Sequence, residues 1–170
     1  MRVIGGKLRG KLIHNPTDKT TRPLKDMVRE SIFNILEHSK NEKIKFKNDV
    51  VLDLFSGSGS FGIECLSRGV KKVFFFENYK PSLKILEKNI KELEIDKDSV
   101  IKEINAYEIS KENIDNEKIN LIYLDPPFKD KNINKLLRKI LDLKIAHKST
   151  LIVIPVSYTH LRDHETPRYL

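Results

Sequence analysis

From residue 49 onward, short apolar runs alternate with segments in which apolar residues recur at helical spacing. The apolar runs lie at 50–54, 73–76, 100–104, 119–124 and 151–154, and the helical segments between them lie at 61–68, 78–93 and 131–143. This alternation predicts an α/β fold with a mainly parallel sheet, right-handed crossovers and helices on both faces. Ligands of such sheets bind beyond the carboxyl ends of the strands, where the strand order reverses.

Two further elements precede this alternation. Residues 1–14 alternate weakly around three glycines, which predicts a small basic β-hairpin rather than a buried strand. A helix is predicted over 23–38, with Pro23 in the first turn, where proline is tolerated. Its apolar stripe, expected in the core, comprises Leu24, Met27, Val28, Ile32, Ile35 and Leu36. Arg22 and Arg29 lie off that stripe.

The excess positive charge lies almost entirely in the first quarter of the chain. Lys and Arg outnumber Asp and Glu by 32 to 24, a net charge of +8. Residues 1–48 contribute +7 (12 basic, 5 acidic), whereas residues 49–170 contribute +1 (20 basic, 19 acidic). A basic amino-terminal arm indicates contact with nucleic-acid phosphates, because clustered Lys and Arg side chains attract polyanions.

Length, cysteine content and hydropathy exclude several classes of protein. A chain of 170 residues fits one domain with a sizeable core. Cys65 is the only cysteine, which excludes an internal disulfide framework and a multi-cysteine zinc site, and we expect no metal. No apolar run approaches the roughly 20 residues that span a bilayer, and the first residues lack a secretory h-region. We therefore expect a cytoplasmic protein without a membrane partner.

A glycine-rich loop follows the first apolar run and precedes a helical segment. Gly57 and Gly59 stand in DLFSGSGSFG (53–62), where glycine lets the backbone turn sharply and approach a ligand. Because Gly62 completes G-x-G-x-x-G, a dinucleotide site is one alternative. Asp53 favours a ligand with a cationic amino group, such as S-adenosylmethionine, since an acid faces a pyrophosphate unfavourably. Glu77, at the end of the next strand, is expected to accept hydrogen bonds from ribose hydroxyls.

A second candidate loop, Asp125-Pro126-Pro127-Phe128, ends the fourth strand on the same predicted edge. The two prolines stiffen the backbone and fix the direction of the neighbouring carboxylate and carbonyls. A methyl transfer to the exocyclic amine of a nucleic-acid base needs such a stiff loop. This amine is a poor nucleophile, because its lone pair is delocalised into the ring. Asp125 and the Pro126 carbonyl are expected to accept its two hydrogens and favour a pyramidal nitrogen. Phe128 is expected to stack on the base.

These residues resemble the RsmD-type methyltransferases, which methylate the N2 amine of a guanine in bacterial 16S ribosomal RNA. The similar segments are RVIGGKLRG (2–10), RPLKDMVRESIFNIL (22–36), VLDLFSGSGSFGIECLSRG (51–69) and DPPF (125–128). Two substitutions depart from the family pattern. Leu24 stands where a threonine often follows Arg-Pro, and Asn105 stands where an acid usually contacts the adenine amine.

The resemblance implies a Rossmann-like methyltransferase that binds S-adenosylmethionine. The residues expected at the cofactor are Asp53, Phe55, Gly57, Ser58, Gly59, Glu77, Asn78, Asn105 and Ala106. Those expected at RNA phosphates are Arg2, Lys7, Arg9, Lys11, Arg22 and Arg29. The implied partner is 16S ribosomal RNA in the small ribosomal subunit or its assembly intermediate, and we expect the enzyme to be a monomer.

The chain is accordingly divided into three parts. Residues 1–22 are expected to form the basic RNA-binding arm, and 23–155 the methyltransferase domain without the family's final strand pair. Residues 156–170 lack apolar periodicity, and we interpret them as a non-native tail.

Three alternative functions are compatible with the same residues. An adenine-N6 methyltransferase of DNA or RNA uses an Asp-Pro-Pro-Phe loop equally well. A dinucleotide-dependent oxidoreductase would use the literal glycine pattern, and a non-catalytic RNA-binding module would retain the fold without the chemistry.

Overall fold

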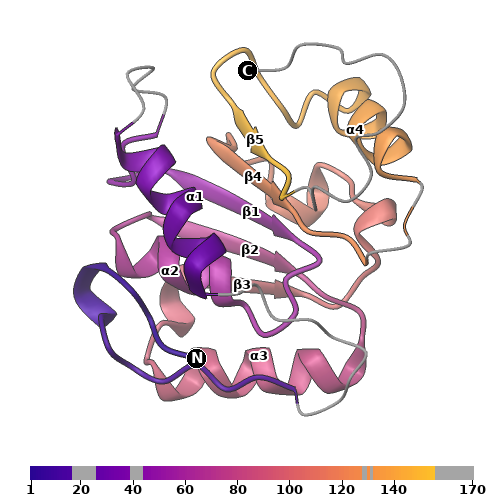
Figure 1. The fold of residues 1–170 in the computed structure, drawn as a ribbon. Helices are drawn as coiled ribbons and strands as arrows, with labels where there is room; N and C mark the ends of the chain where they lie inside the picture. Colours follow the sequence, from indigo (N-terminus) through magenta and orange to yellow (C-terminus); the bar gives the residue numbers. More distant parts are fainter. Residues whose placement is uncertain (17–25, 39–43, 128–129, 131, 156–170) are drawn as a thin grey trace, which may run out of the picture.

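A computed structural model describes residues 1–16, 26–38, 44–127, 130 and 132–155 (Figure 1). Its centre is a sheet of five parallel strands in the order β3-β2-β1-β4-β5. The strands are β1 (Val50–Leu54), β2 (Lys72–Phe76), β3 (Ser99–Lys102), β4 (Leu121–Leu124) and β5 (Leu151–Val153). The predicted α/β fold with a parallel sheet is confirmed, because every strand pair in this sheet is parallel.

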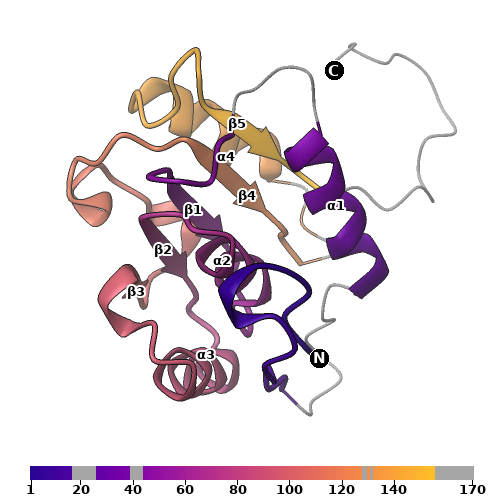
Figure 2. The same cartoon turned by 90° about the vertical axis from the view of Figure 1, so that its left-hand side faces the viewer.

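Helices cover both faces of the sheet, as predicted (Figures 1 and 2). They are α1 (Asp26–His38), α2 (Ser60–Ser67), α3 (Lys80–Glu92) and α4 (Ile133–Asp142), with short 3-10 turns η1 (Gly6–Leu8), η2 (Asp96–Asp98), η3 (Ala106–Glu108) and η4 (Glu112–Ile114). One core cluster joins α1, α2 and α3 to alternate strand residues, including Val51 and Phe75. The other joins α4, η3 and η4 to the intervening residues, including Leu52 and Phe74. The period of two along each strand therefore assigns neighbouring side chains to opposite layers.

The strand order reverses between β1 and β4. The chain passes from β1 to β2 and β3 on one side, then returns to place β4 and β5 on the other side of β1. Leu54 is paired with Leu124, so β1 and β4 end at the same level of the sheet. This boundary is the switch point at which open α/β sheets bind ligands.

The amino-terminal hairpin forms, and it is anchored in the core. An antiparallel bridge joins Arg2 and Leu12, and the Ile13 N–H donates to the Met1 carbonyl at 2.9 Å. Val3 and Ile13 are buried, so the hairpin has a buried side that the weak alternation did not predict. Its turn lies against α2, where a Cβ on Gly6 would lie 2.0 Å from the Ser67 carbonyl oxygen. With a φ of +72° as well, Gly6 is required for this approach.

Helix α1 packs through a different face from the predicted one. Its buried residues are Arg29, Phe33 and Leu36, whereas Met27 and Ile35 are 77% and 68% exposed. The predicted stripe is therefore wrong at these two positions and at Val28, which is also exposed. The reason is that Phe33 stacks on Phe61 of α2, which turns Arg29 beneath the hairpin.

Several predictions fall outside the described residues or need correction. Arg22, Phe128, the start of the helix at Pro23 and the tail at 156–170 lie outside the described part of the chain. Helix α3 has Tyr79 as its N-cap and carries Pro81 in its first turn, where proline is tolerated. Among the described residues, no helix has the length and apolar character needed to cross a membrane.

Candidate active site at the carboxyl end of the sheet

The glycine loop and the proline loop leave neighbouring strands at one edge of the sheet. Asp53 and Tyr123 are paired across β1 and β4, and each strand ends one residue later. The Asp125 N–H points to the Leu54 carbonyl at 3.4 Å. The prediction that residues 53–59 and the Asp125 loop open onto the same rim is confirmed for the described residues 125–127.

Backbone contacts fix the shape of the glycine loop. The Ser56 hydroxyl donates to the Asp53 carbonyl at 2.7 Å, and the Gly59 N–H donates to the Ser56 carbonyl at 2.8 Å. Gly59 has a φ of +81°, and a Cβ there would lie 2.4 Å from the Leu86 side chain of α3. The Leu86 side chain of α3 therefore packs against the glycine loop at Gly59. The positive φ of Gly59 also allows α2 to begin at Ser60.

The Glu77 carboxylate lies across the glycine loop. One of its oxygens accepts the Gly57 N–H at 2.7 Å, and the other accepts the Tyr79 N–H at 2.7 Å. A carboxylate oxygen has a second lone pair, so both oxygens retain capacity for ligand hydroxyls. Asn78 lies between Glu77 and Tyr79 in the sequence and is exposed.

Asp53 is buried at the start of this loop and accepts the Gly62 N–H at 3.1 Å. Burial raises the pKa of Asp53 to about 8; the Gly62 hydrogen bond opposes this shift, and the charges of Asp125 and Glu77 add to it. The carboxyl group is therefore largely protonated at neutral pH in the absence of a ligand. A cation placed beside it would favour the carboxylate instead.

Asp125 is partly buried at the end of β4. Burial raises the pKa of Asp125 to about 6, and a hydrogen bond from Tyr123 opposes that shift. The Tyr123 hydroxyl lies 3.4 Å from one Asp125 oxygen. The residues after Asp125 are stiffened by Pro126 and Pro127, and the Pro127 carbonyl accepts the Asp130 N–H at 2.8 Å.

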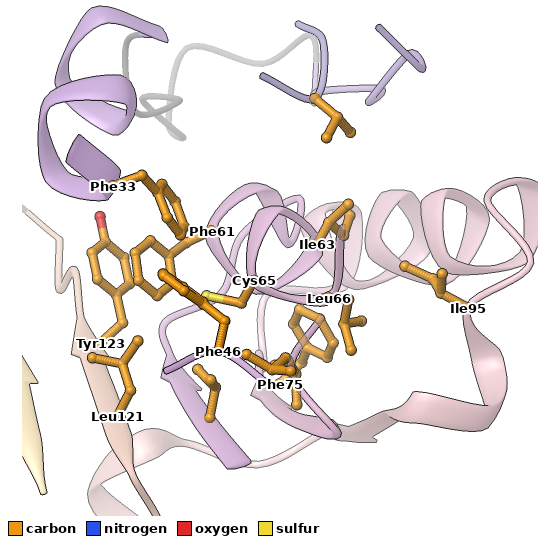
Figure 3. Close-up of a cluster of buried hydrophobic side chains, with 14 of the residues drawn as sticks. Phe33, Phe46, Phe61, Ile63, Cys65, Leu66, Phe75, Ile95, Leu121 and Tyr123 are labelled. Carbon is orange, nitrogen blue, oxygen red and sulfur yellow. The ribbon is translucent and has the colours of Figure 1, made fainter. Parts of the chain in front are cut away.

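An aromatic stack that sequence reasoning missed supports Tyr123. The Tyr123 ring stacks on Phe61 with centroids 3.8 Å apart and an interplanar angle of 8°, and Phe61 stacks on Phe33 at 5.0 Å. Figure 3 shows these rings side by side, contributed by β4, α2 and α1, with the Tyr123 hydroxyl directed toward α1. The period of two from Asp125 to Tyr123 is the signal that places both side chains on one face of the strand.

The predicted adenine turn lies at the end of β3. Asn105 is the N-cap of η3, and its side-chain oxygen accepts the Tyr107 N–H at 3.0 Å. Ala106 is buried, and the Tyr107 ring meets the Phe55 ring edge to face at 5.8 Å. The Tyr107 hydroxyl donates to Asp130 at 2.7 Å. Tyr107, which was not predicted, thus joins the glycine loop, the adenine turn and the segment after the prolines.

Four of the predicted RNA contacts are exposed on the hairpin: Arg2, Lys7, Arg9 and Lys11. The prediction that Arg29 contacts phosphates is wrong, because Arg29 is fully buried. Its guanidinium donates to the Arg2 carbonyl and to Asp26, and burial lowers its pKa. The helical spacing placed Arg29 off the apolar stripe but could not show that the hairpin covers it.

Glu64 of α2 lies at the centre of a buried charge cluster. Its carboxylate accepts the backbone N–H groups of Ile4 at 2.8 Å and Gly5 at 2.7 Å, and Arg68 pairs with it at 2.9 Å. The Arg29 Nε lies 4.0 Å away and has no hydrogen-bond partner among the described residues. Glu64 therefore fixes the basic hairpin to the helix that follows the glycine loop.

Comparison with known proteins agrees with this architecture. The family model described as conserved hypothetical protein 95 matches residues 1–166. The protein named "Putative rRNA methyltransferase YlbH" of Bacillus subtilis is 32% identical over 168 residues, which is 98% of this chain and 86% of that protein. Ribosomal RNA small subunit methyltransferase D of Buchnera aphidicola subsp. Acyrthosiphon pisum is 30% identical, covering 89% of this chain and 75% of the relative.

A solved structure is similar to this chain in both fold and sequence. The structure titled "Putative methyltransferase yhhF from Escherichia coli" superposes with a TM-score of 0.75 at 28% identity, over 91% of this chain and 80% of that one. The fold is therefore that of a Rossmann-like methyltransferase. The chain belongs to the conserved hypothetical protein 95 family, the family of the RsmD-type methyltransferases.

Proposed function

We propose that the protein transfers a methyl group from S-adenosylmethionine to the exocyclic N2 amine of a guanine in 16S ribosomal RNA. The observation that carries the proposal is the shared rim of β1 and β4, where Asp53 and its loop lie beside Asp125. Relatives named ribosomal RNA small subunit methyltransferase D support the choice of substrate.

The residues at the rim fit the proposed cofactor. S-adenosylmethionine, when bound, supplies an electrophilic methyl group on a sulfonium sulfur. The buried Asp53 carboxyl suits a cationic amino group, which would favour its ionised form. Glu77 retains lone pairs for the ribose hydroxyls, and the Asn105 amide oxygen retains one for the adenine amine. Phe55, Ser58 and Asn78 are proposed to complete the contacts.

The proline loop prepares the nitrogen for attack. Asp125 and the Pro126 carbonyl accept the two amine hydrogens and direct the nitrogen lone pair toward the methyl carbon. Bound S-adenosylmethionine would supply the methyl group and keep the electron pair of the broken C–S bond on sulfur, while Asp125, as the acceptor of one amine hydrogen, would receive the proton that the nitrogen loses. Catalysis of this kind depends mainly on placing the reacting atoms about 3–3.5 Å apart and in line. Phe128 is proposed to stack on the guanine, which must leave a duplex or lie in a single-stranded segment.

The basic hairpin is proposed to hold the RNA. Arg2, Lys7, Arg9 and Lys11 present their charges on one exposed element, and Arg22 is proposed to extend that surface. The substrate is a small ribosomal subunit or an assembly intermediate, and the protein acts in the cytoplasm as a monomer.

Methylation of small subunits tests this function. Subunits from cells that lack this enzyme are incubated with the protein and methyl-labelled S-adenosylmethionine, and the RNA is digested to nucleosides for mass spectrometry. Labelled N2-methylguanosine is expected, with a loss of about 10²-fold or more for Asp125→Asn because the amine is then misplaced. Asp142→Asn, on the exposed side of α4, is the matched control. Labelled N6-methyladenosine, or no labelled nucleoside, contradicts the proposal.

A further inference from the structure

A buried asparagine joins the basic hairpin to the glycine loop. Asn89 of α3 is 1% exposed, and its side chain makes three hydrogen bonds to backbone groups outside its own helix. Its amide oxygen accepts the His14 N–H at 2.8 Å, and its amide nitrogen donates to the His14 carbonyl and to the Ser58 carbonyl, both at 2.9 Å. One side chain thus holds two segments that are 44 positions apart in the sequence, at 14 and 58.

Neighbouring contacts reinforce the connection. The Ser58 hydroxyl donates to the side-chain oxygen of Asn15 at 3.0 Å, so the glycine loop touches the end of the hairpin directly as well as through Asn89. The His14 ring lies 2.8 Å from Glu92, one turn further along α3. The indigo amino-terminal ribbon passes beside α3 in Figure 1, as these contacts require. The segment at 14–15 is therefore tied to both the loop and the helix beneath it.

These three hydrogen bonds do not stabilise α3 itself, because their partners lie outside the helix. Asparagine is a poor residue for a helix interior, because its side chain competes for backbone hydrogen bonds. A buried amide is retained without penalty only where its donors and acceptor are satisfied, as they are here. The three partners all belong to the hairpin end or to the cofactor loop. Lys11, one of the proposed RNA contacts, precedes His14 by three residues on the same strand of the hairpin.

We propose that Asn89 is a positioning residue that couples RNA binding at the hairpin to cofactor binding at the glycine loop. The inference rests on the proposed function for the identity of the two ligands. RNA that fixes the hairpin also fixes His14, and Asn89 transmits that constraint to the Ser58 carbonyl beside Gly57 and Gly59. Because Asn89 bonds both segments, a ligand that restricts the motion of one segment lowers the entropic cost of restricting the other, so the two ligands bind with positive cooperativity. Coupling between binding sites is reciprocal, so each ligand tightens the other by the same factor.

Calorimetric binding of S-adenosylhomocysteine, with and without saturating unmethylated small subunits, measures this coupling. For the wild-type protein we expect the dissociation constant to fall at least about fivefold when subunits are present. Asn89→Leu keeps the branched shape of the side chain and removes all three bonds, and Asn89→Asp keeps only the acceptor for the His14 N–H. Both are expected to weaken cofactor binding without RNA by about five- to tenfold and to bring the ratio of the two constants close to one.

Two further variants separate coupling from a general loss of structure. Ser82→Ala is the matched control, because Ser82 is fully buried on α3 and its hydroxyl has no hydrogen-bond partner among the described residues. It is expected to retain the wild-type ratio. Asn15→Ala removes the second connection at a half-buried position and is expected to reduce the ratio about twofold. Steady-state kinetics distinguish a loss of coupling from a loss of stability. In the Asn89 variants, KM for both substrates is expected to rise while kcat changes less than about threefold.

The outcomes distinguish this inference from the proposed function. A wild-type ratio of one, or an Asn89→Asp variant that retains the wild-type ratio, overturns the coupling even if methyl transfer occurs. Loss of the ratio in Asn89→Asp and its partial loss in Asn15→Ala, with Ser82→Ala unchanged, supports it. Binding of S-adenosylhomocysteine without any methyl transfer to RNA would contradict the proposed function, while the coupling would still be decided by the binding ratios.

Discussion

Glu64→Gln is expected to detach the basic hairpin from α2 at a large cost in stability. The Glu64 carboxylate is fully buried and accepts backbone N–H groups of Ile4 and Gly5 at 2.8 and 2.7 Å. Glutamine keeps one acceptor oxygen but turns an NH₂ group toward one of these N–H donors. The substitution also removes the negative charge that Arg29 and Arg68 face.

The magnitude follows from the charge left behind. Arg29 is fully buried, and its remaining ionic partner, Asp26, is 63% exposed. Removing one member of a buried ion pair costs about 3–5 kcal/mol, because the other charge stays desolvated without compensation. For a protein of this size, a change of that kind lowers Tm by roughly 6–20 °C. The unfolding free energy from urea titration and the Tm from circular dichroism are the measurements.

Glu37→Gln is the matched control for this prediction. Glu37 also pairs with Arg68, but its side chain is 33% exposed, so its loss is expected to cost about 1 kcal/mol or less. Adding Arg29→Met to Glu64→Gln removes the stranded charge and is expected to recover part of the loss. Hydrogen exchange at the Ile4 and Gly5 amides should accelerate in Glu64→Gln alone. If Glu64→Gln melts within about 2 °C of the wild type, the reasoning about the buried cluster is refuted.

Three further predictions concern the rim and the hairpin turn. In the ligand-free protein, the free energy of unfolding should fall as pH rises from about 4 to about 8, because folded Asp53, with its pKa raised to about 8, holds a proton that the unfolded chain releases. Urea titrations should show a weaker pH dependence of this free energy for Asp53→Asn. The same pH dependence in the variant and the wild type would refute the raised pKa of Asp53. Tyr123→Phe removes the hydroxyl that donates to Asp125 and lowers its pKa, so the acid limb of the pH profile of kcat/KM should move from about pH 6 to higher pH. An acid limb that does not move would show that Tyr123 does not tune the pKa of Asp125. Gly6→Ala should lower the free energy of unfolding by about 2 kcal/mol or more, because the new Cβ would collide with the Ser67 carbonyl and residue 6 has a positive φ. Thermal melting measures this loss, and an unchanged Tm would show that the turn is free to move.

Much of the fold could be predicted from the sequence because local patterns determine it. The apolar runs and helical segments after residue 49 each correspond to a strand or helix, and the parallel sheet follows from their alternation. The shared rim of Asp53 and Asp125 could also be predicted, since both follow apolar runs and parallel strands end at one edge. In these cases a residue's place depends on its neighbours in the sequence.

The contacts between the hairpin and the helices could not be predicted in this way. Arg29 is buried because the Arg2 carbonyl and Glu64 surround it, and these partners are 27 and 35 positions away in the sequence. Hydrophobic periodicity treats a charged residue as exposed and has no means of detecting such partners. Asn89 carries no local signal either, because its partners belong to the hairpin and the glycine loop.

A crystal structure of the protein with S-adenosylhomocysteine tests the central claim most directly. We expect the amino group beside Asp53, the ribose hydroxyls at Glu77, and the sulfur atom facing the space in front of Asp125 and Pro126. A ligand bound away from this rim, for example in the hollow lined by Glu117, Lys144 and His147, would contradict it.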